Sequence, residues 1–335
     1  MASIGVVGGS GFLGAELLRL CSVHPALDVE VVTGDTQAGT TIAELYPSLA
    51  GAYPGVRFTP YDPAALDGLE LVFLALPHGR SQELVPDLRN RVKRVVDLAA
   101  DFRLRDAALY PTWYGEAHQH PELLSEAVYG LPELSRDALG SSTLVAAAGC
   151  YPTAATLALR PLIDAGLIEA SGIVVDAASG VSGAGRDKFP FCGTDENFAA
   201  YGLLDHRHTP EIEQCLGAQV IFTPHLAPMN RGILATCYAR LTDGATSGTV
   251  MDALHAAYDR EPFVIVTDAP PSTKATSGSN IAQVTARVDA RTGWVLALCA
   301  IDNLVKGGSG QAVQCANLSL GLDETAGLPL VGLYP

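Results

Sequence analysis

The chain has 335 residues, enough for two domains of ordinary size. Hydrophobic residues make up 48% of it and charged residues 17%, a balance that supports large buried cores and excludes disorder throughout the chain. The formal net charge of −15 argues against nucleic acid and anionic membrane surfaces as partners. An anionic small-molecule substrate must therefore be bound by a few well-placed Arg, Lys or backbone N–H groups.

Cysteine usage and hydropathy indicate the compartment. The chain has seven cysteines, an odd number, with neither a Cys-x-x-Cys pair nor the spacing of a metal site. Several lie in apolar runs, as reduced core cysteines do. The amino terminus lacks the basic and apolar regions of a secretory signal, and no apolar stretch reaches the roughly 20 residues of a membrane span. We therefore expect a cytoplasmic protein without a bound metal.

The first part of the chain alternates short apolar strands with helices. Strands are predicted at residues 3–7, 29–33, 69–76 and 95–98, and the first two flank a helical pattern at 15–20. Short apolar strands separated by helix lengths are typical of parallel βαβ units. This part is therefore predicted to be α/β, with a doubly wound parallel sheet of the Rossmann type.

The pattern changes after about residue 150. Longer strands with alternating polarity are predicted at 172–177, 232–241, 281–288 and 294–301. A Pro-, Ser- and Thr-rich stretch at 269–279 predicts a loop. Alternating strands of this length are typical of an antiparallel or mixed sheet covered by helices on one face. We place the domain boundary near Gly149 and expect an α+β second domain with a mixed sheet.

A glycine-rich turn joins the first strand to the first helix. Gly9, Gly11 and Gly14 fit G-x-G-x-x-G, and Gly8 with the last two fits G-x-x-G-x-x-G. Glycines let the backbone turn tightly and approach a pyrophosphate, which the helix N-terminus then binds. Between a strand and a helix at the start of the chain, the turn predicts dinucleotide binding, although many tight strand-to-helix turns also contain glycines.

The end of the second strand does not decide between NAD and NADP. An acidic residue there normally binds the ribose 2′-hydroxyl of NAD, whereas a nearby Arg accepts the 2′-phosphate of NADP. The chain reads Thr33-Gly34-Asp35-Thr36 at this point, without an Arg. Asp35 either favours NAD or caps a turn, and the residues alone leave the choice open.

Cys150 is the leading candidate for a nucleophile. It lies between an apolar strand that ends near Ala148 and a helical pattern at 154–162. At such a junction the helix dipole and free backbone N–H groups stabilise a thiolate, the nucleophilic form of cysteine. The same N–H groups can stabilise an oxyanion. The alternative is a buried structural cysteine at a strand end.

Two histidines precede another predicted helix. His206, Arg207 and His208 stand directly before Thr209 and Pro210, which predict a helix with Thr209 as its N-cap and Pro210 as its first residue. Imidazoles at a helix entrance offer a thiol the acid or base it needs. The alternative is that each histidine is a surface or satisfied core residue.

Glycines and serines follow the strand predicted at 172–177. Residues 179–186 offer backbone and hydroxyl donors to an anion, and Arg186 adds a positive charge. The alternative is a flexible connector.

Taken together, these segments resemble the N-acetyl-gamma-glutamyl-phosphate reductases of arginine biosynthesis, relatives of the aspartate-semialdehyde dehydrogenases. The resemblance spans the chain, from the glycine turn to Asn303-Leu304-Val305-Lys306-Gly307. Its most specific motifs are Gly149-Cys150-Tyr151-Pro152-Thr153, residues 179–186, His206-Arg207-His208-Thr209-Pro210-Glu211-Ile212, and Phe222-Thr223-Pro224-His225.

The resemblance implies a complete reaction. The chain would reduce N-acetyl-L-glutamyl 5-phosphate to the 5-semialdehyde and phosphate with NADPH. Cys150 would attack the acyl carbon and expel phosphate, and the thioester would then accept a hydride. His208 would be the general acid/base, and His206 and Glu211 would orient it, although the sequence leaves open which histidine faces the thiol.

Further site residues carry over from the same resemblance. The substrate residues would be Arg103, Ser179, Gly180, Arg186 and Arg207. The cofactor residues would be Gly8, Ser10, Gly11, Phe12, Leu13, Gly14, Thr33, Pro77, Gly183 and Asn303. The resemblance also implies an NADP-binding domain at 1–149, completed by a closing helix at about 304–335. Residues 150–303 would form a catalytic and oligomerisation domain of a homo-oligomer, a dimer or a tetramer.

The sequence departs from the family in two places. The turn has Gly9 where Ala is usual, and residues 33–36 lack the Ser-Arg pair that some members place near the 2′-phosphate. The second departure removes the residues on which the expected preference for NADP over NAD would rest.

Three other functions stay open. A reductase of lysine biosynthesis that acts on a carrier-protein-linked aminoadipyl or glutamyl phosphate would read Gly-Cys-Asn-Ala-Thr around the thiol, and the acidic chain offers no dock for an acidic carrier. A thiol hydrolase or acyl-transferring enzyme using Cys150 and His208 without redox chemistry would not need the glycine turn. A nucleotide-sensing regulator would need neither residue, nor Arg186.

Overall fold

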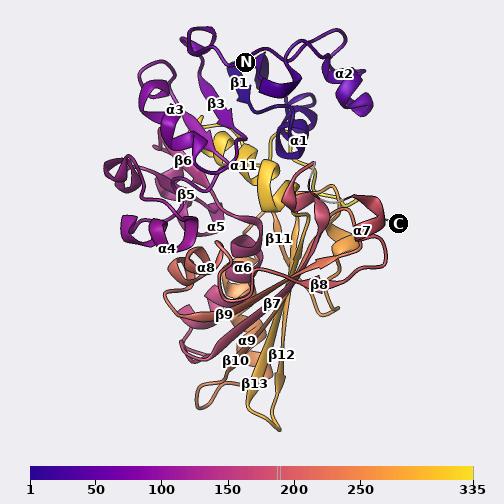
Figure 1. Cartoon of the computed structure of the whole chain (residues 1–335). Coiled ribbons are helices and arrows are strands. Elements are labelled where there is room, and N and C mark those ends of the chain that lie inside the picture. Colours follow the sequence, from indigo (N-terminus) through magenta and orange to yellow (C-terminus); the bar gives the residue numbers. More distant parts are fainter. Residues whose placement is uncertain (187, 189, 335) are drawn as a thin grey trace. The chain divides into compact units, whose positions relative to one another are not determined.

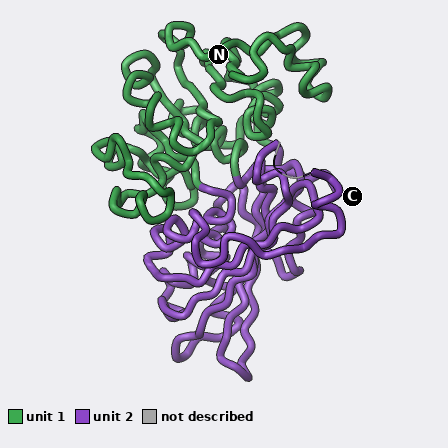
Figure 2. Tube along the Cα trace, in the orientation of Figure 1, with its two compact units in different colours: residues 1–148, 308–328 green, residues 149–307, 329–335 purple. Residues whose placement is uncertain are grey.

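The computed structural model describes residues 1–186, 188 and 190–334 (Figure 1). The chain divides into two compact units, which Figure 2 shows in separate colours. Unit 1 comprises residues 1–148 and 308–328, and unit 2 comprises residues 149–307 and those from 329 onward. The chain therefore passes from one unit to the other next to Cys150.

A six-stranded parallel sheet forms the centre of unit 1, with its strands in the order β2-β1-β3-β4-β6-β5. The strands are β1 (Ala2–Val7), β2 (Leu27–Val32), β3 (Leu71–Leu74), β4 (Val95–Asp97), β5 (Val128–Gly130) and β6 (Leu144–Ala147). Strands β3 and β6 are apolar and buried along their whole length, as central strands of a parallel sheet are. The strand order starts at β2 and reverses between β1 and β3, which is the arrangement of a doubly wound sheet.

Six α-helices belong to the described part of unit 1. They are α1 (Phe12–Cys21), α2 (Ile42–Leu45), α3 (Arg80–Leu88), α4 (Tyr110–Tyr114), α5 (Pro132–Leu139) and α11 (Gly310–Ser319). Helix α11 comes from the far end of the chain and packs on α1 and α5 and against β4, β5 and β6. A core that includes Val7, Val72, Phe102 and Leu144 lies against the sheet.

The closing helix is shorter than the stretch of about 304–335 that the sequence predicted. A π-helical turn at Val305–Ser309 leads into α11, which ends at Ser319. Gly321 then adopts a φ of 68°, a left-handed conformation that a helix cannot continue. The last residues return to unit 2, where the Leu333 N–H donates to the Ser277 carbonyl and the Pro329 carbonyl accepts from Asn280.

Unit 2 contains a seven-stranded mixed sheet in the order β11-β12-β13-β10-β7-β9-β8. The strands are β7 (Ile173–Gly180), β8 (Ala199–Ala200), β9 (Val220–Ala227), β10 (Ile233–Arg240), β11 (Val264–Val266), β12 (Ala282–Asp289) and β13 (Trp294–Ile301). Pairs β11–β12 and β7–β9 are parallel and the others are antiparallel. Burial alternates along β7 and β10, so one face of the sheet packs on the core.

The described helices of unit 2 are α6 (Cys150–Asp164), α7 (Phe191–Thr194), α8 (Thr209–Leu216), α9 (Ser247–Tyr258) and α10 (Thr273–Thr276). Three of them, namely α6, α8 and α9, contribute to that core together with the strands. Every residue of α6 from Tyr151 to Leu159 is buried. Helix α6 packs on β10, β13 and β12, and α9 packs on β12 and the edge strand β11. Helix α10 lies inside the stretch predicted as a loop, because the Ser272 side chain accepts the Ala275 N–H and caps a short helical turn.

The predicted fold class is confirmed: a Rossmann-type parallel sheet is followed by an α+β unit with a mixed sheet. In the described ranges, no helix combines the length and the apolar character that crossing a membrane requires.

Candidate active site

The glycine turn after β1 forms a cradle at the N-terminus of α1. Gly8 has a φ of 88°, which favours glycine, and its N–H donates to the Thr33 hydroxyl at 3.3 Å. A Cβ on Gly14 would lie 2.4 Å from the Gly8 carbonyl oxygen, so only glycine lets the helix approach the turn this closely. Gly11 is the N-cap of α1 and makes no side-chain cap bond. A Cβ on Gly11 would have no neighbour nearer than 3.8 Å, so this position opens onto space that a ligand can fill.

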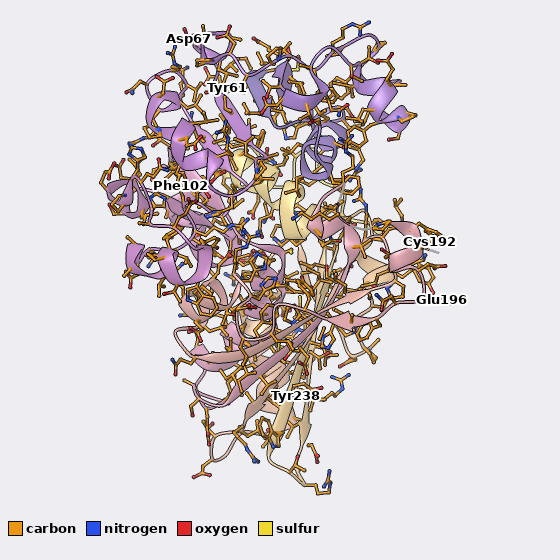
Figure 3. The ribbon with its side chains drawn as sticks, viewed as in Figure 1. Tyr61, Asp67, Phe102, Cys192, Glu196 and Tyr238 are labelled. Carbon is orange, nitrogen blue, oxygen red and sulfur yellow. The ribbon has the colours of Figure 1, made fainter. Side chains whose placement is uncertain are left out.

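A cavity of about 380 Å³ lies beside this cradle, within unit 1. Seven of the expected cofactor residues line it: Gly8, Ser10, Gly11, Phe12, Leu13, Thr33 and Pro77. Gly14 packs behind the turn, and Gly183 and Asn303 belong to unit 2. Tyr61 (labelled in Figure 3), Arg80 and Leu84 also line the cavity and are not among the residues expected from the sequence. Pro77, an expected cofactor residue three positions before Arg80, was the available signal for this helix.

Cys150 is the first residue of α6, in unit 2. Its N-cap, Gly149, is extended and makes no side-chain cap bond, so the first turn keeps its backbone donors close to the half-buried thiol. The Gly149 N–H donates to Glu211 Oε1 at 2.7 Å, and that carboxylate is completely buried. A Cβ on Gly307 would lie 2.8 Å from the Cys150 Cβ, so the glycine makes room for the thiol.

The two histidines gather beside Cys150 around Tyr151, the next residue of α6. The His206 and His208 rings are 5.0 Å apart, and they lie 5.6 and 5.8 Å from the Tyr151 ring. The Tyr201 hydroxyl donates to the Tyr151 hydroxyl at 3.1 Å, which in turn donates to the His225 carbonyl at 3.3 Å. The structure thus gathers two predicted motifs around Tyr151. Tyr201 belongs to neither motif, and no pattern in the sequence pointed to it.

The two histidines differ in their surroundings. His206 is largely buried, and burial, followed by the positive charge of Arg207, lowers its pKa to about 4. It is therefore neutral near pH 7, and its Nδ1 accepts the His208 N–H at 3.1 Å. His208 is the N-cap of α8, and Pro210 is the second residue of the helix. The prediction of Thr209 as N-cap was wrong by one residue, because Thr209 already has helical geometry and is followed by a helix-starting proline.

The predicted anion cluster lies at the end of β7. Ser179 is buried and its hydroxyl donates to the Gly180 carbonyl, while a Cβ on Gly180 would lie 2.7 Å from the Asn230 carbonyl oxygen. Asn303 joins this segment, because its amide donates to the Ser182 hydroxyl at 3.0 Å and its oxygen accepts the Gly232 N–H at 2.7 Å. Gly183 lies beside the Asn303 amide. Arg186 is half-buried and Arg207 is exposed.

Arg103 lies in unit 1, at the carboxyl ends of two neighbouring strands. Its side chain is largely buried, its Nε donates to the Ala147 carbonyl and its Nη2 to the Leu98 carbonyl, both at 2.8 Å. The guanidinium therefore ties the end of β4 to the end of β6, the strand that leads into the Cys150 turn.

Comparison with known proteins identifies the family of the chain. The model for the semialdehyde dehydrogenase NAD-binding domain matches residues 3–142, and the model for the semialdehyde dehydrogenase dimerisation domain matches residues 150–303. A curated N-acetyl-gamma-glutamyl-phosphate reductase from Ectopseudomonas mendocina is 46% identical, with all of both chains covered. One from Desulforudis audaxviator is 47% identical, again over 100% of each chain. The chain belongs to the N-acetyl-gamma-glutamyl-phosphate reductase family.

Solved structures agree with this family at the level of the fold. Aspartate semialdehyde dehydrogenase II from Vibrio cholerae superposes with a TM-score of 0.72 at 16% identity, covering 96% of this chain and 98% of that one. The enzyme from Candida albicans, solved with NADP, gives a TM-score of 0.65 at 13% identity and covers 95% and 98%. At these identities the likeness shows the fold alone.

The residues present fit a nicotinamide dinucleotide. The semialdehyde dehydrogenase NAD-binding domain model covers the glycine turn. At the N-terminus of α1, the turn leaves open space beside Gly11, where an added Cβ would have no neighbour nearer than 3.8 Å. In the described ranges, no three His, Cys, Asp or Glu side chains come together as a metal site would require.

Proposed function

We propose that the chain reduces N-acetyl-L-glutamyl 5-phosphate to N-acetyl-L-glutamate 5-semialdehyde and phosphate with NADPH, in arginine biosynthesis. The observation that carries the proposal is the position of Cys150 at the N-terminus of a buried helix beside two histidines, in a chain 46% identical over its whole length to a named reductase. The bound cofactor would supply the hydride.

Cys150 begins the reaction as a thiolate stabilised by the first turn of α6. Its sulfur attacks the acyl carbon, a C–S bond forms, and the bond to the phosphate oxygen breaks. Backbone N–H groups of that turn stabilise the oxyanion that develops on the carbonyl. Hydride addition to the thioester gives a thiohemiacetal, whose C–S bond then breaks to release the aldehyde and regenerate the thiolate.

His208 moves the proton in this scheme, and His206 and Glu211 position it. A neutral His206 accepts the His208 N–H, which fixes the backbone at the entrance of α8. Glu211 links the same helix to Gly149, directly before the thiol. Arg103, Ser179, Gly180, Arg186 and Arg207 are the proposed substrate residues. The oxyanion and phosphate thus meet localised donors in a chain whose net charge is −15.

Cys150→Ser tests covalent catalysis. The variant should bind NADPH as the wild type does, yet lose several orders of magnitude in turnover, because a hydroxyl is a far weaker nucleophile. Ordinary turnover by this variant would contradict the mechanism. In the reverse direction, semialdehyde and NADP should yield NADPH at a rate that depends on added phosphate. A rate independent of phosphate would indicate a simple aldehyde dehydrogenase.

A side-by-side assay separates the rival substrates. The free N-acetyl acyl phosphate and a carrier-linked aminoadipyl or glutamyl phosphate would be offered with each nicotinamide cofactor. We expect turnover of the free substrate only. Turnover of the carrier-linked substrate would favour the lysine-biosynthesis reductase, and absence of nucleotide binding would favour a non-redox Cys/His enzyme.

We also propose that the chain forms a homo-oligomer, a dimer or a tetramer, through the sheet of unit 2. Helices α6 and α9 pack on one face of this sheet, while half-exposed apolar side chains lie on the alternate positions, among them Val174, Leu234, Tyr238 (labelled in Figure 3) and Leu296. Sedimentation analysis should give a multiple of the 34.9 kDa chain mass. The described cysteines are free thiols, as in a reducing compartment, so we place the protein in the cytoplasm.

A further inference from the structure

The cavity beside the glycine turn has one cationic side chain. Among the described residues that line it, Arg80 is the only Arg or Lys and Asp35 is the only acidic residue. Both therefore bear on which nucleotide the cavity accepts. Residues 33–36, directly after β2, include no Arg, although a Rossmann domain distinguishes the 2′-group of the ribose at this place.

Arg80 is held only loosely by the protein. It is the first residue of α3, directly after Gly79, whose φ of 90° turns the chain into the helix. Its guanidinium pairs with Glu83 one turn along the same helix, at 2.5 Å. The two side chains are 56% and 42% exposed. Exposed pairs of this kind are weak, so the guanidinium can leave Glu83 for a more highly charged partner.

We propose that Arg80 binds the 2′-phosphate of NADP(H) and gives this chain its preference for NADP over NAD. The inference rests on the proposed function, which requires a nicotinamide cofactor. The cavity joins Arg80 to Thr33, Asp35 and Thr36, the residues at the end of β2 where the 2′-group lies in Rossmann domains. Arg80 thus supplies the missing arginine from α3.

Charge explains why Arg80 is needed at this place. A phosphate near Asp35 meets a like charge, and the chain as a whole is strongly acidic. A guanidinium offsets both and can form two parallel hydrogen bonds with phosphate oxygens. The 2′-hydroxyl of NAD carries no charge, so its binding gains little from Arg80.

Nucleotide binding to the full-length protein, without substrate, tests the proposal. Titration calorimetry would compare NADPH with NADH, and 2′,5′-ADP with 5′-ADP, on the wild type and on Arg80→Gln. We expect the variant to bind NADPH and 2′,5′-ADP about 10- to 100-fold more weakly, the loss that follows from removing a charge-assisted hydrogen bond. Affinity for NADH and 5′-ADP should stay unchanged.

Two variants on the same helix serve as controls. Arg89→Gln removes an arginine at the end of α3 that pairs with Glu126 and does not line the cavity, so it should leave all four affinities unchanged. Glu83→Gln releases Arg80 from its ion pair and should not weaken NADPH binding.

Two outcomes would overturn the proposal. Equal weakening of NADPH and NADH by Arg80→Gln would assign the guanidinium to the pyrophosphate, and unchanged NADPH binding would remove it from the site. Failure of the proposed function looks different: the wild type would then not reduce the acyl phosphate, whatever the effect of Arg80→Gln on nucleotide binding.

Discussion

Replacing Glu211 tests whether the thiol and the histidines depend on one buried hydrogen bond. The Glu211 carboxylate is 0% exposed and accepts the Gly149 N–H at 2.7 Å. Gly149 is itself buried and is the N-cap of the helix that begins with Cys150. Glu211 lies in the first turn of α8, whose N-cap is His208. The bond therefore connects the turn that carries the nucleophile with the helix entrance that carries the proposed acid/base.

The size of the effect follows from burial and charge. A hydrogen bond to a charged group contributes about 1.5–3 kcal/mol, and leaving a buried N–H without its acceptor costs a similar amount. Glu211→Ala should therefore lower the free energy of unfolding of unit 2 by about 2–3 kcal/mol. Glu211→Gln keeps an oxygen acceptor but loses its charge, so it should cost about 1 kcal/mol. A shift of the thiol by about 1 Å is enough to reduce turnover about 100-fold, which we expect for Glu211→Ala.

Urea unfolding, followed by tryptophan fluorescence, measures the change in the free energy of unfolding. The chain has two tryptophans, Trp113 in unit 1 and Trp294 in unit 2, so a Trp113→Phe background makes Trp294 report on the unit that contains Glu211. Steady-state kinetics on the same proteins give kcat and the KM for NADPH. We expect kcat to fall with the KM for NADPH unchanged, because the glycine turn belongs to unit 1. Unfolding of Glu211→Ala at the wild-type urea concentration would show that this hydrogen bond does not stabilise unit 2. An equal loss of stability in the Gln and Ala variants would show that an oxygen acceptor at this position makes no difference.

Three more predictions concern single positions. Gly14→Ala places a Cβ 2.4 Å from a backbone oxygen of the turn and should abolish nucleotide binding with a loss of stability, whereas Gly11→Ala should fold normally and weaken nucleotide binding alone, as calorimetry would show. Burial, followed by the nearby Asp101, raises the pKa of Asp97 to about 7. The unfolded chain ionises this carboxyl near pH 4, whereas the folded chain keeps it protonated up to about pH 7. The free energy of unfolding therefore falls between about pH 4 and 7. The free energy of unfolding of Asp97→Asn should therefore exceed that of the wild type by up to about 4 kcal/mol at pH 8 and by little at pH 4, as urea unfolding would measure. Gly307→Ala places a Cβ 2.8 Å from that of Cys150 and should slow both turnover and alkylation of the thiol by iodoacetamide, with unit 2 still folded.

A control or a contrary result tests each of these predictions. Gly248→Ala, whose Cβ would meet nothing nearer than 3.8 Å, should leave turnover and alkylation unchanged beside Gly307→Ala. Identical behaviour of Gly14→Ala and Gly11→Ala would contradict the division between packing and ligand approach. A wild-type stability that does not decline between pH 4 and 8 relative to Asp97→Asn would show that Asp97 does not titrate in this range.

The sequence by itself determined many of the strands and helices and the two main motifs. Apolar runs such as 69–76 predicted central parallel strands, because continuous apolarity suits a strand buried on both faces. The glycine turn was recognisable because its residues are consecutive and each glycine has a local steric reason. Cys150 at a strand-to-helix junction was recognisable for the same reason, since the helix dipole acts on its own first turn.

Tertiary structure alone decided what lies around these motifs. Glu211 meets Gly149 across 62 positions of sequence, and Gly307 comes against Cys150 from the far end of unit 2. Arg80 enters the nucleotide cavity from α3, although the sequence rule directs attention to the residues after β2. Helix and strand propensity, turn conformation and the helix dipole depend on neighbouring residues in the sequence, so local patterns predict them. Close packing and long-range hydrogen bonds depend on which strands pair and which helices cover them, and only the folded chain specifies those neighbours.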